Sequence, residues 1–164
     1  MQNTLWAPWR GTYVTGGKPL SGCVFCNNFK SADDKGNYLL FRGSSAFVIM
    51  NLYPYNNGHL MVVPVRHAGD ILELSKEEFE EMGSLMRYSV KIIKEAMKAE
   101  GFNVGYNIGS AAGAGIAAHL HMHIVPRWNG DTNFMPVVSE TKVISEHMDV
   151  TYAKLAELFS RLKI

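Results

Sequence analysis

The segment from His119 to Val125 constrains the fold more than any other feature of the sequence, because imidazole and apolar side chains alternate along it. On a β-strand this period of two puts His119, His121 and His123 on one face and the apolar residues between them on the other. Three adjacent imidazoles need polar partners when buried, so we do not expect this face to be ordinary core. A metal site and a catalytic site both remain open.

Histidine in this arrangement suits chemistry at phosphorus. A neutral imidazole is abundant near pH 7, and the phosphoimidazole that it forms is reactive. When one ring nitrogen attacks, the other must carry the proton and donate it, and strand carbonyls supply acceptors. Flanking imidazoles can bond phosphate oxygens and protonate a leaving group, which is worth about 10²–10⁴ in rate. The pattern favours catalysis on a phosphate, with a purely metal-binding strand as the rival interpretation.

A loop of small residues, from Gly109 to Gly115, comes just before the histidines. Small residues let backbone N–H groups approach a phosphate closely. The glycines precede a strand and not a helix, which argues against a dinucleotide-binding βαβ unit. The loop is therefore interpreted as a phosphate-binding loop, and a flexible connection is the alternative.

Hydrophobic periodicity predicts one long helix, over Ser75 to Glu100. Ser75 and Glu78 fit a capping box at its start, and apolar residues recur every three or four positions from Phe79 to Met97. Gly101 is expected to end the helix in the C′ position.

Five short segments read as strands. They are 38–42, 46–52, 59–65, 104–108 and 120–126. A terminal helix is expected over 145–162, and residues 1–35 are expected to be an irregular arm. Strands arranged around one long helix favour an α+β fold with an antiparallel sheet.

Cys23 and Cys26 are the only cysteines. Met1 to Arg10 lacks the apolar core of a signal peptide and no apolar run approaches about 18 residues, so we expect a cytoplasmic protein without a membrane partner. In that compartment the Cys-x₂-Cys spacing indicates a metal half-site or a redox pair. The formal net charge of +1 gives no reason to expect a nucleic-acid partner.

These motifs together resemble the histidine triad (HIT) superfamily of nucleotide hydrolases and transferases. The segment from His119 to Val125 fits its His-φ-His-φ-His-φ-φ signature, and 51–67 resembles its upstream segment, with Asn51, the Gly58–His59 pair and His67. Features at 5–10, at Asn107 and over 125–134 are similar to the diadenosine tetraphosphate phosphorylase branch. The resemblance implies a single domain over 1–164, with an N-terminal arm at 1–35 and a C-terminal extension at 130–164.

The resemblance also implies roles for individual residues. His121 would be the nucleophile that takes up a nucleoside monophosphate, with His123 and His59 beside it and His119 completing the triad. The implied nucleotide-binding residues are Asn51 at the ribose, Val24, Phe25 and Met50 at the base, Asn107, Gly113, Ala114 and Gly115 at the phosphates, and Trp128 at the acceptor end.

A structural zinc ion is implied as well, with Cys23, Cys26, His67 and His119 as ligands. Two buried, reduced thiols without metal are the alternative. No organic cofactor is implied. Members of the superfamily pair their sheets into a ten-stranded sheet, so a homodimer is expected.

The sequence departs from the family at Ala114 and Gly115. The phosphorylase branch has Gly then Ser there and the hydrolase branches Gly then Gln, so Gly115 has no side chain to donate to phosphate. A backbone N–H or Ser110 would have to substitute, and phosphate and water both stay open as acceptor. Dinucleoside polyphosphate cleavage is the leading interpretation; the alternatives are an adenosine 5′-monophosphoramidase-type hydrolase and a non-catalytic, zinc-stapled nucleotide-binding module.

Overall fold

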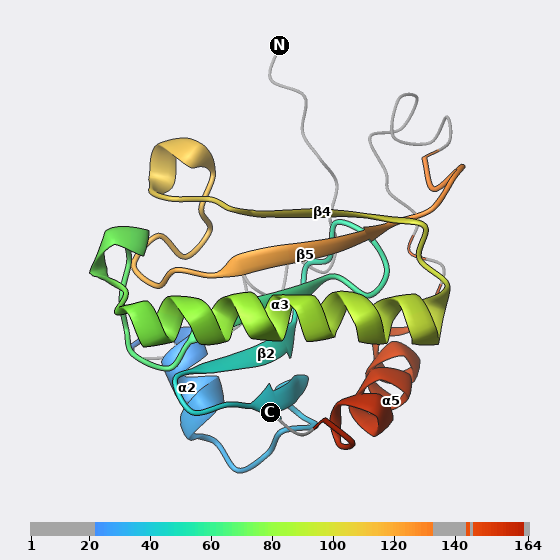
Figure 1. The fold of residues 1–164 in the computed structure, drawn as a ribbon, viewed down its shortest axis with the longest axis horizontal. Helices are drawn as coiled ribbons and strands as arrows, with labels where there is room; N and C mark the ends of the chain where they lie inside the picture. The colour runs from blue at the N-terminus through green and yellow to red at the C-terminus, as the bar shows by residue number, and fades with distance from the viewer. Residues whose placement is uncertain (1–21, 133–143, 145, 163–164) are drawn as a thin grey trace.

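A five-stranded antiparallel sheet forms the centre of the protein, in the strand order β1-β2-β3-β5-β4 (Figure 1). This computed structural model describes residues 22–132, 144 and 146–162. The strands are β1 (Leu39–Arg42), β2 (Ala46–Met50), β3 (Leu60–Pro64), β4 (Gly101–Tyr106) and β5 (Met122–Arg127).

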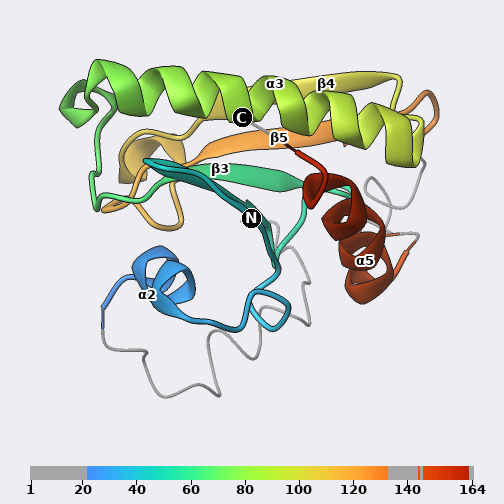
Figure 2. The same ribbon diagram turned by 60° about the horizontal axis from the view of Figure 1, so that its bottom comes forward.

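Two helices cover one face of the sheet. The long helix α3 (Lys76–Met97) runs along the strands and packs on β2, β3 and β5, and α5 (Met148–Phe159) packs beside it near β1 (Figures 1 and 2). The predicted capping box is present: the Ser75 side chain accepts from the Glu78 N–H, and the Glu78 carboxylate accepts from the Ser75 N–H. The prediction of an α+β fold with a five-stranded antiparallel sheet, one long helix and a C-terminal helix is confirmed.

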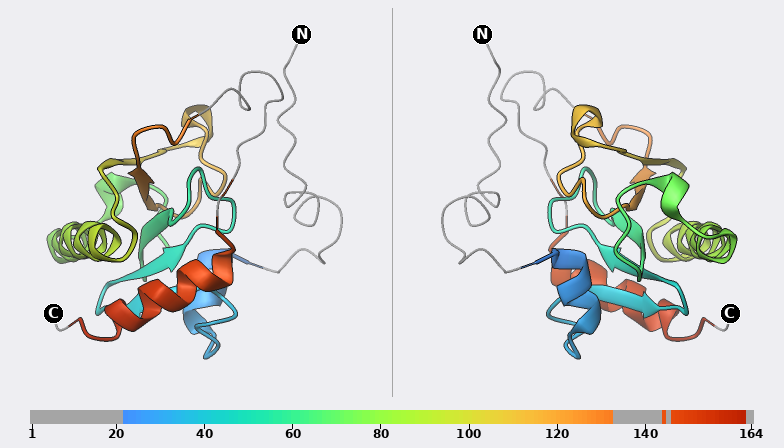
Figure 3. Two further views of the ribbon diagram at one scale, coloured as in Figure 1. Left: turned by 90° about the vertical axis from the view of Figure 1, so that its right-hand side faces the viewer. Right: turned by 90° about the vertical axis from the view of Figure 1, so that its left-hand side faces the viewer.

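The opposite face of the sheet is covered by a short helix, α2 (Val24–Lys30), as the views in Figures 2 and 3 show. The sequence prediction was wrong here, since residues 22–35 were expected to be irregular. The helix has seven residues, Cys23 gives it no side-chain cap, and Asn27 and Asn28 are poor helix formers. Tertiary packing holds it: Phe25 is buried against the sheet in a second apolar cluster.

Several boundaries also differ from prediction. Helix α3 ends at Met97, and its cap is Lys98 in the left-handed conformation (φ 54°), whose N–H donates to the Lys94 carbonyl. Gly101 does not cap the helix; it begins β4, opposite Arg127. Strand β5 begins at Met122, because the chain before it pairs with a loop and not with β3: the Leu120 N–H donates to the Ala68 carbonyl.

The remaining elements are two short 3₁₀ helices, η1 (Ile71–Glu73) and η2 (Ser110–Ala112), the second inside the small-residue loop. Among the described residues, no helix has the length and apolarity to cross a bilayer. Residues 1–21 of the expected arm, with the motif at 5–10, lie outside the described residues, as do residues 133–143, 145 and 163–164 of the expected extension at 130–164. The predictions for them stay predictions.

Candidate functional site

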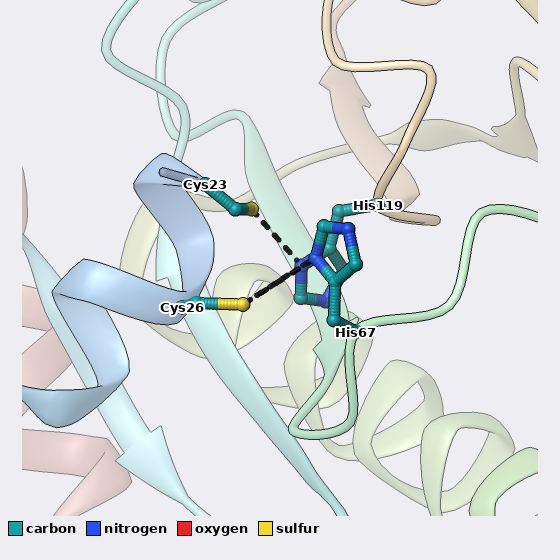
Figure 4. Close-up of side chains that lie close together, drawn as sticks. All are labelled: Cys23, Cys26, His67 and His119. Carbon is teal, nitrogen blue, oxygen red and sulfur yellow. Dashed lines mark hydrogen bonds between the residues drawn. The ribbon is translucent and has the colours of Figure 1, made fainter. Parts of the chain in front are cut away.

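Cys23, Cys26, His67 and His119 direct their side chains to one point between α2 and the approach to β5 (Figure 4). Their four ligand atoms all lie within 4.8 Å of one another. The Nδ1 atom of His119 is 3.2 Å from both Cys23 Sγ and His67 Nδ1. Tetrahedral zinc, with Zn–N near 2.0 Å and Zn–S near 2.3 Å, sets its ligands about 3.3–3.8 Å apart. The donors and their spacing therefore fit a four-coordinate metal ion.

The backbone orients His119 for that role. Its Nε2 lies 2.9 Å from the Pro64 carbonyl oxygen, which can only accept, so Nε2 carries the proton and Nδ1 presents its lone pair to the thiols. Burial and the neighbouring Cys23 raise the pKa of the Cys26 thiol. A cation would oppose this shift, because it binds the thiolate form.

A second group of histidines lies further along the same face, and its hydrogen bonds fix where the protons sit. The backbone N–H of Tyr55 donates to His59 Nδ1 over 3.1 Å, so His59 carries its proton on Nε2. That Nε2 lies 3.0 Å from His123 Nδ1, which must accept. His123 consequently carries its proton on Nε2. The Asn107 amide nitrogen lies 3.4 Å from that Nε2, and because both atoms would donate, this tautomer requires the Asn107 amide to turn its oxygen toward His123.

Both of these imidazoles are neutral at physiological pH. Burial, with smaller contributions from neighbouring histidines, lowers the pKa of His59 to about 3 and that of His123 to about 4. The hydrogen bond from the Tyr55 N–H to His59, together with the one from His59 to His123, therefore leaves His123 Nε2 as a neutral N–H donor.

His121 has the opposite tautomer. Its Nδ1 lies 2.9 Å from the His119 carbonyl oxygen and must donate to it, so Nε2 holds a lone pair. Burial lowers the pKa of His121, although the hydrogen bond to the carbonyl opposes the shift. The His121 and His123 rings are 4.8 Å apart between centroids. The arrangement places a nucleophilic nitrogen beside an N–H donor.

An aromatic wall borders this pair. The Phe25 ring lies 5.1 Å from His121 and 5.4 Å from His119 between centroids, and Val24 packs in the same cluster. Asn51 is near the histidines too: its Nδ2 is 3.3 Å from His59 Nδ1, and its Oδ1 accepts from the Tyr53 N–H.

Two of the expected nucleotide-binding residues are not brought to the histidines. Met50 packs on the other face of the sheet, in the core beneath α3, and Ile49 is the residue of β2 that belongs to the Phe25 cluster. Trp128 lies past the far end of β5, where its Nε1–H donates to the Met97 carbonyl at the end of α3. The structure therefore does not bring Met50 or Trp128 to the histidines, and their expected roles at the base and at the acceptor end stay predictions.

The small-residue loop leads directly from β4 toward His119. Gly113 has φ of 83° and closes η2, and Gly113 and Gly115 are exposed while Ala114 is partly buried. From Gly113 to Gly115 the loop thus offers backbone rather than side-chain groups, and Ser110, which is exposed at the start of η2, supplies its one hydroxyl.

Sequence reasoning missed Tyr55 and Ile49. Tyr55 sets the His59 tautomer through its backbone, and its ring lies 4.8 Å from the His59 ring and 5.7 Å from the His123 ring. The sequence around Tyr55 predicts only a turn, and a turn gives no indication that a backbone N–H will contact a histidine.

An antiparallel α+β sheet whose fifth strand and its approach present three alternating histidines defines the class of histidine-triad proteins. Residues 36–130 match the HIT domain family model, and the chain belongs to the HIT family.

Among its relatives is a protein named AP-4-A phosphorylase from Mycobacterium tuberculosis, 36% identical over 164 residues, covering 96% of this chain and 84% of the relative. Another is an asymmetrical bis(5′-nucleosyl)-tetraphosphatase from Schizosaccharomyces pombe, 26% identical, covering 76% and 64%. A solved structure, of a Zn-bound histidine triad family protein from Mycobacterium smegmatis, superimposes with a TM-score of 0.67 at 22% identity, covering 85% of this chain and 94% of that one.

Proposed function

We propose that this protein is an enzyme that cleaves dinucleoside polyphosphates through a nucleotidyl-histidine intermediate on His121. The observation that carries the proposal is the hydrogen bond from His121 Nδ1 to the His119 carbonyl oxygen, at 2.9 Å. It leaves the Nε2 lone pair available at neutral pH, and this is the requirement for nucleophilic catalysis by imidazole. The names of the two relatives, a phosphorylase and a tetraphosphatase, support the same substrate class.

The chemistry follows from the two tautomers. The lone pair on His121 Nε2 attacks the α-phosphorus, and the bond from that phosphorus to the bridging oxygen breaks. The electron pair leaves with the departing nucleotide, and the Nε2–H of His123 can bond the bridging oxygen as charge develops there. The proton stays on His121 Nδ1, which donates it in a hydrogen bond to the His119 carbonyl oxygen. An incoming water or phosphate oxygen then attacks the same phosphorus, and the phosphorus–Nε2 bond breaks with its electron pair returning to His121. When water is the acceptor, it releases a proton to the solvent.

The Phe25 side of His121 is proposed to hold the nucleoside that becomes attached. Phe25, Val24 and Ile49 form an apolar wall of the kind that small-ligand sites use for a base, and Asn51 is the proposed ribose contact. Asn107 and the backbone of Gly113, Ala114 and Gly115 are the proposed contacts of the phosphates.

We propose that the Cys₂His₂ cluster holds a zinc ion. Two thiolates and two imidazoles in a closed set of four are the donors that structural zinc prefers. The ion would fasten α2, and with it Phe25, to the segment that carries His119. It would position the site without entering the reaction.

The dimer is likewise a proposal. Strand β4 is at the edge of the sheet, and Val104 on it and Phe79 on α3 are 44% and 49% exposed. An unpaired edge strand beside exposed apolar side chains is suited to pairing with a second copy.

Product analysis tests the proposed function. Diadenosine tetraphosphate is incubated with the protein with and without inorganic phosphate, and the nucleotides are separated by chromatography. A phosphorylase gives ADP and ATP only when phosphate is present, whereas a hydrolase gives AMP and ATP in either case. His121→Asn is the matched variant and should form neither set. Turnover of adenosine 5′-phosphoramidate without any turnover of the tetraphosphate would replace the proposal by the phosphoramidase alternative, and binding without turnover of either would replace it by the binding module.

A further inference from the structure

Two adjoining surface hollows extend the histidine site along β4 and β5, on the side away from Phe25. One, of about 230 Å³, is lined by His123 and Asn107 and continues past Gly105. The other, of about 210 Å³, continues toward Arg127. Both share Tyr55, Asn103 and Val125 as walls. Each is smaller than the 300–1,000 Å³ typical of a whole ligand site, which suits part of a ligand.

We propose that these hollows are the subsite for the nucleoside of the departing nucleotide. This inference rests on the proposed function and adds to it which residues recognise the second half of the substrate. His121 lies between Phe25 and His123, so a dinucleotide whose first nucleoside is at Phe25 must direct its second half past His123. The hollows are where that path leads.

The charges of the lining favour a nucleoside over the polyphosphate itself. Of the described residues that line the hollows, Arg127 is the only cationic one, and Asp131 neutralises it with two hydrogen bonds, of 2.6 and 2.8 Å. The Asp131 carboxylate is also held by Asn56, and the Arg127 guanidinium keeps the pKa of Asp131 far below its usual range. A guanidinium engaged in this way adds little attraction for phosphate.

The uncharged walls offer what a base needs. Tyr55 is 53% exposed, so it has ring surface for stacking. The Asn103 side-chain oxygen accepts from Arg127, and among the described residues its amide N–H groups have no partner. They can donate to a ring nitrogen or carbonyl.

Gly105 keeps the hollow open beside the reacting groups. It pairs with His123 across β4 and β5, and a Cβ built on it would meet no atom within 4 Å. A Cβ at Gly105 would therefore enter the hollow without meeting a neighbouring atom. Gly101, four residues earlier and on the same face of β4, gives the matched control: its Cβ would meet only Arg127 Cβ, at 3.7 Å, which is ordinary contact.

The test compares the wild type with Gly105→Ala, Gly105→Val and Gly101→Val. Values of kcat/KM are measured for diadenosine tetraphosphate and for adenosine 5′-phosphoramidate, whose leaving group is only ammonia. We expect the ratio of the first value to the second to fall by at least about tenfold in Gly105→Val, by less in Gly105→Ala, and to stay within about twofold in Gly101→Val. Equal loss with both substrates, or no loss, overturns the subsite.

Calorimetry makes the outcome independent of turnover. A methylene-bridged diadenosine tetraphosphate should bind the wild type more tightly than AMP does, and Gly105→Val should remove most of that advantage. If the advantage survives in Gly105→Val, or never exists in the wild type, the subsite is wrong even if the enzyme turns over. If it disappears as expected in a protein without turnover, the subsite stands and only the proposed function fails.

Discussion

Replacing His59 by phenylalanine tests the chain of neutral tautomers that prepares His123. Phenylalanine keeps a ring of similar size but neither accepts from the Tyr55 N–H nor donates to His123 Nδ1. His59 is 1% exposed, so water does not replace the two lost hydrogen bonds, and each stranded partner costs about 1–3 kcal/mol of stability. His123 is then free to move its proton to Nδ1, which removes the donor facing the substrate. Loss of one preorganised donor lowers kcat by about 10²–10³.

Single-turnover kinetics with diadenosine tetraphosphate measures this loss, and urea denaturation gives the change in the free energy of unfolding. His59→Gln is the control, because its carboxamide nitrogen can still donate to His123 Nδ1, and it should recover most of the rate. Nitrogen NMR of His123 should report its proton on Nε2 in the wild type and in His59→Gln only. A folded His59→Phe protein with kcat within about threefold of the wild type would refute the reasoning.

The remaining predictions concern stability. Cys26→Ser should lower the metal content, measured by elemental analysis, and reduce the free energy of unfolding by several kcal/mol, since metal binding to such sites contributes about 10 kcal/mol or more to folding; unchanged zinc content and stability would remove the four-ligand site. The pKa values of His59 and His123 are about 3 and 4 when folded and near 6.5 when unfolded, so below pH 6.5 the unfolded chain takes up protons that the folded one does not. The free energy of unfolding should therefore decrease as the pH is lowered, by about 2 kcal/mol for each imidazole at pH 5. Between pH 7.5 and pH 5 the urea midpoint should drop less in His59→Gln than in the wild type; an equal drop would contradict the low pKa of His59.

Patterns that depend on one element alone were predictable from the sequence. The alternation at 119–125 and the helical stripe with its Ser75 cap were both sufficient to locate the histidine segment and α3. The four metal-ligand residues, expected from the family resemblance, do lie together. The features that the sequence did not predict depend on contacts between different elements. Helix α2 has weak intrinsic helix propensity and depends on the burial of Phe25 against the sheet.

The face of the sheet on which Met50 lies could not be predicted for a similar reason. All five residues of β2 are buried, because the sheet is covered on both faces, so the sequence has no alternation of apolar and polar residues from which to read which face each residue occupies. From the sequence, Ile49 and Met50 are equally suitable for the base pocket beside Phe25 until the register of β2 is known. The tautomers of His59 and His123 depend on the Tyr55 backbone N–H, which no residue pattern reveals.

The central claim is that His121 forms a covalent bond to the nucleotide. Wild-type protein is mixed with diadenosine tetraphosphate, quenched within one turnover under alkaline conditions that preserve phosphoimidazoles, and examined by intact-protein and peptide mass spectrometry. We expect an adenylyl group on the peptide that contains His121, absent in His121→Asn and in unreacted protein. An adenylyl group on another residue, or turnover by the wild type without any adduct during the first turnover, would contradict it.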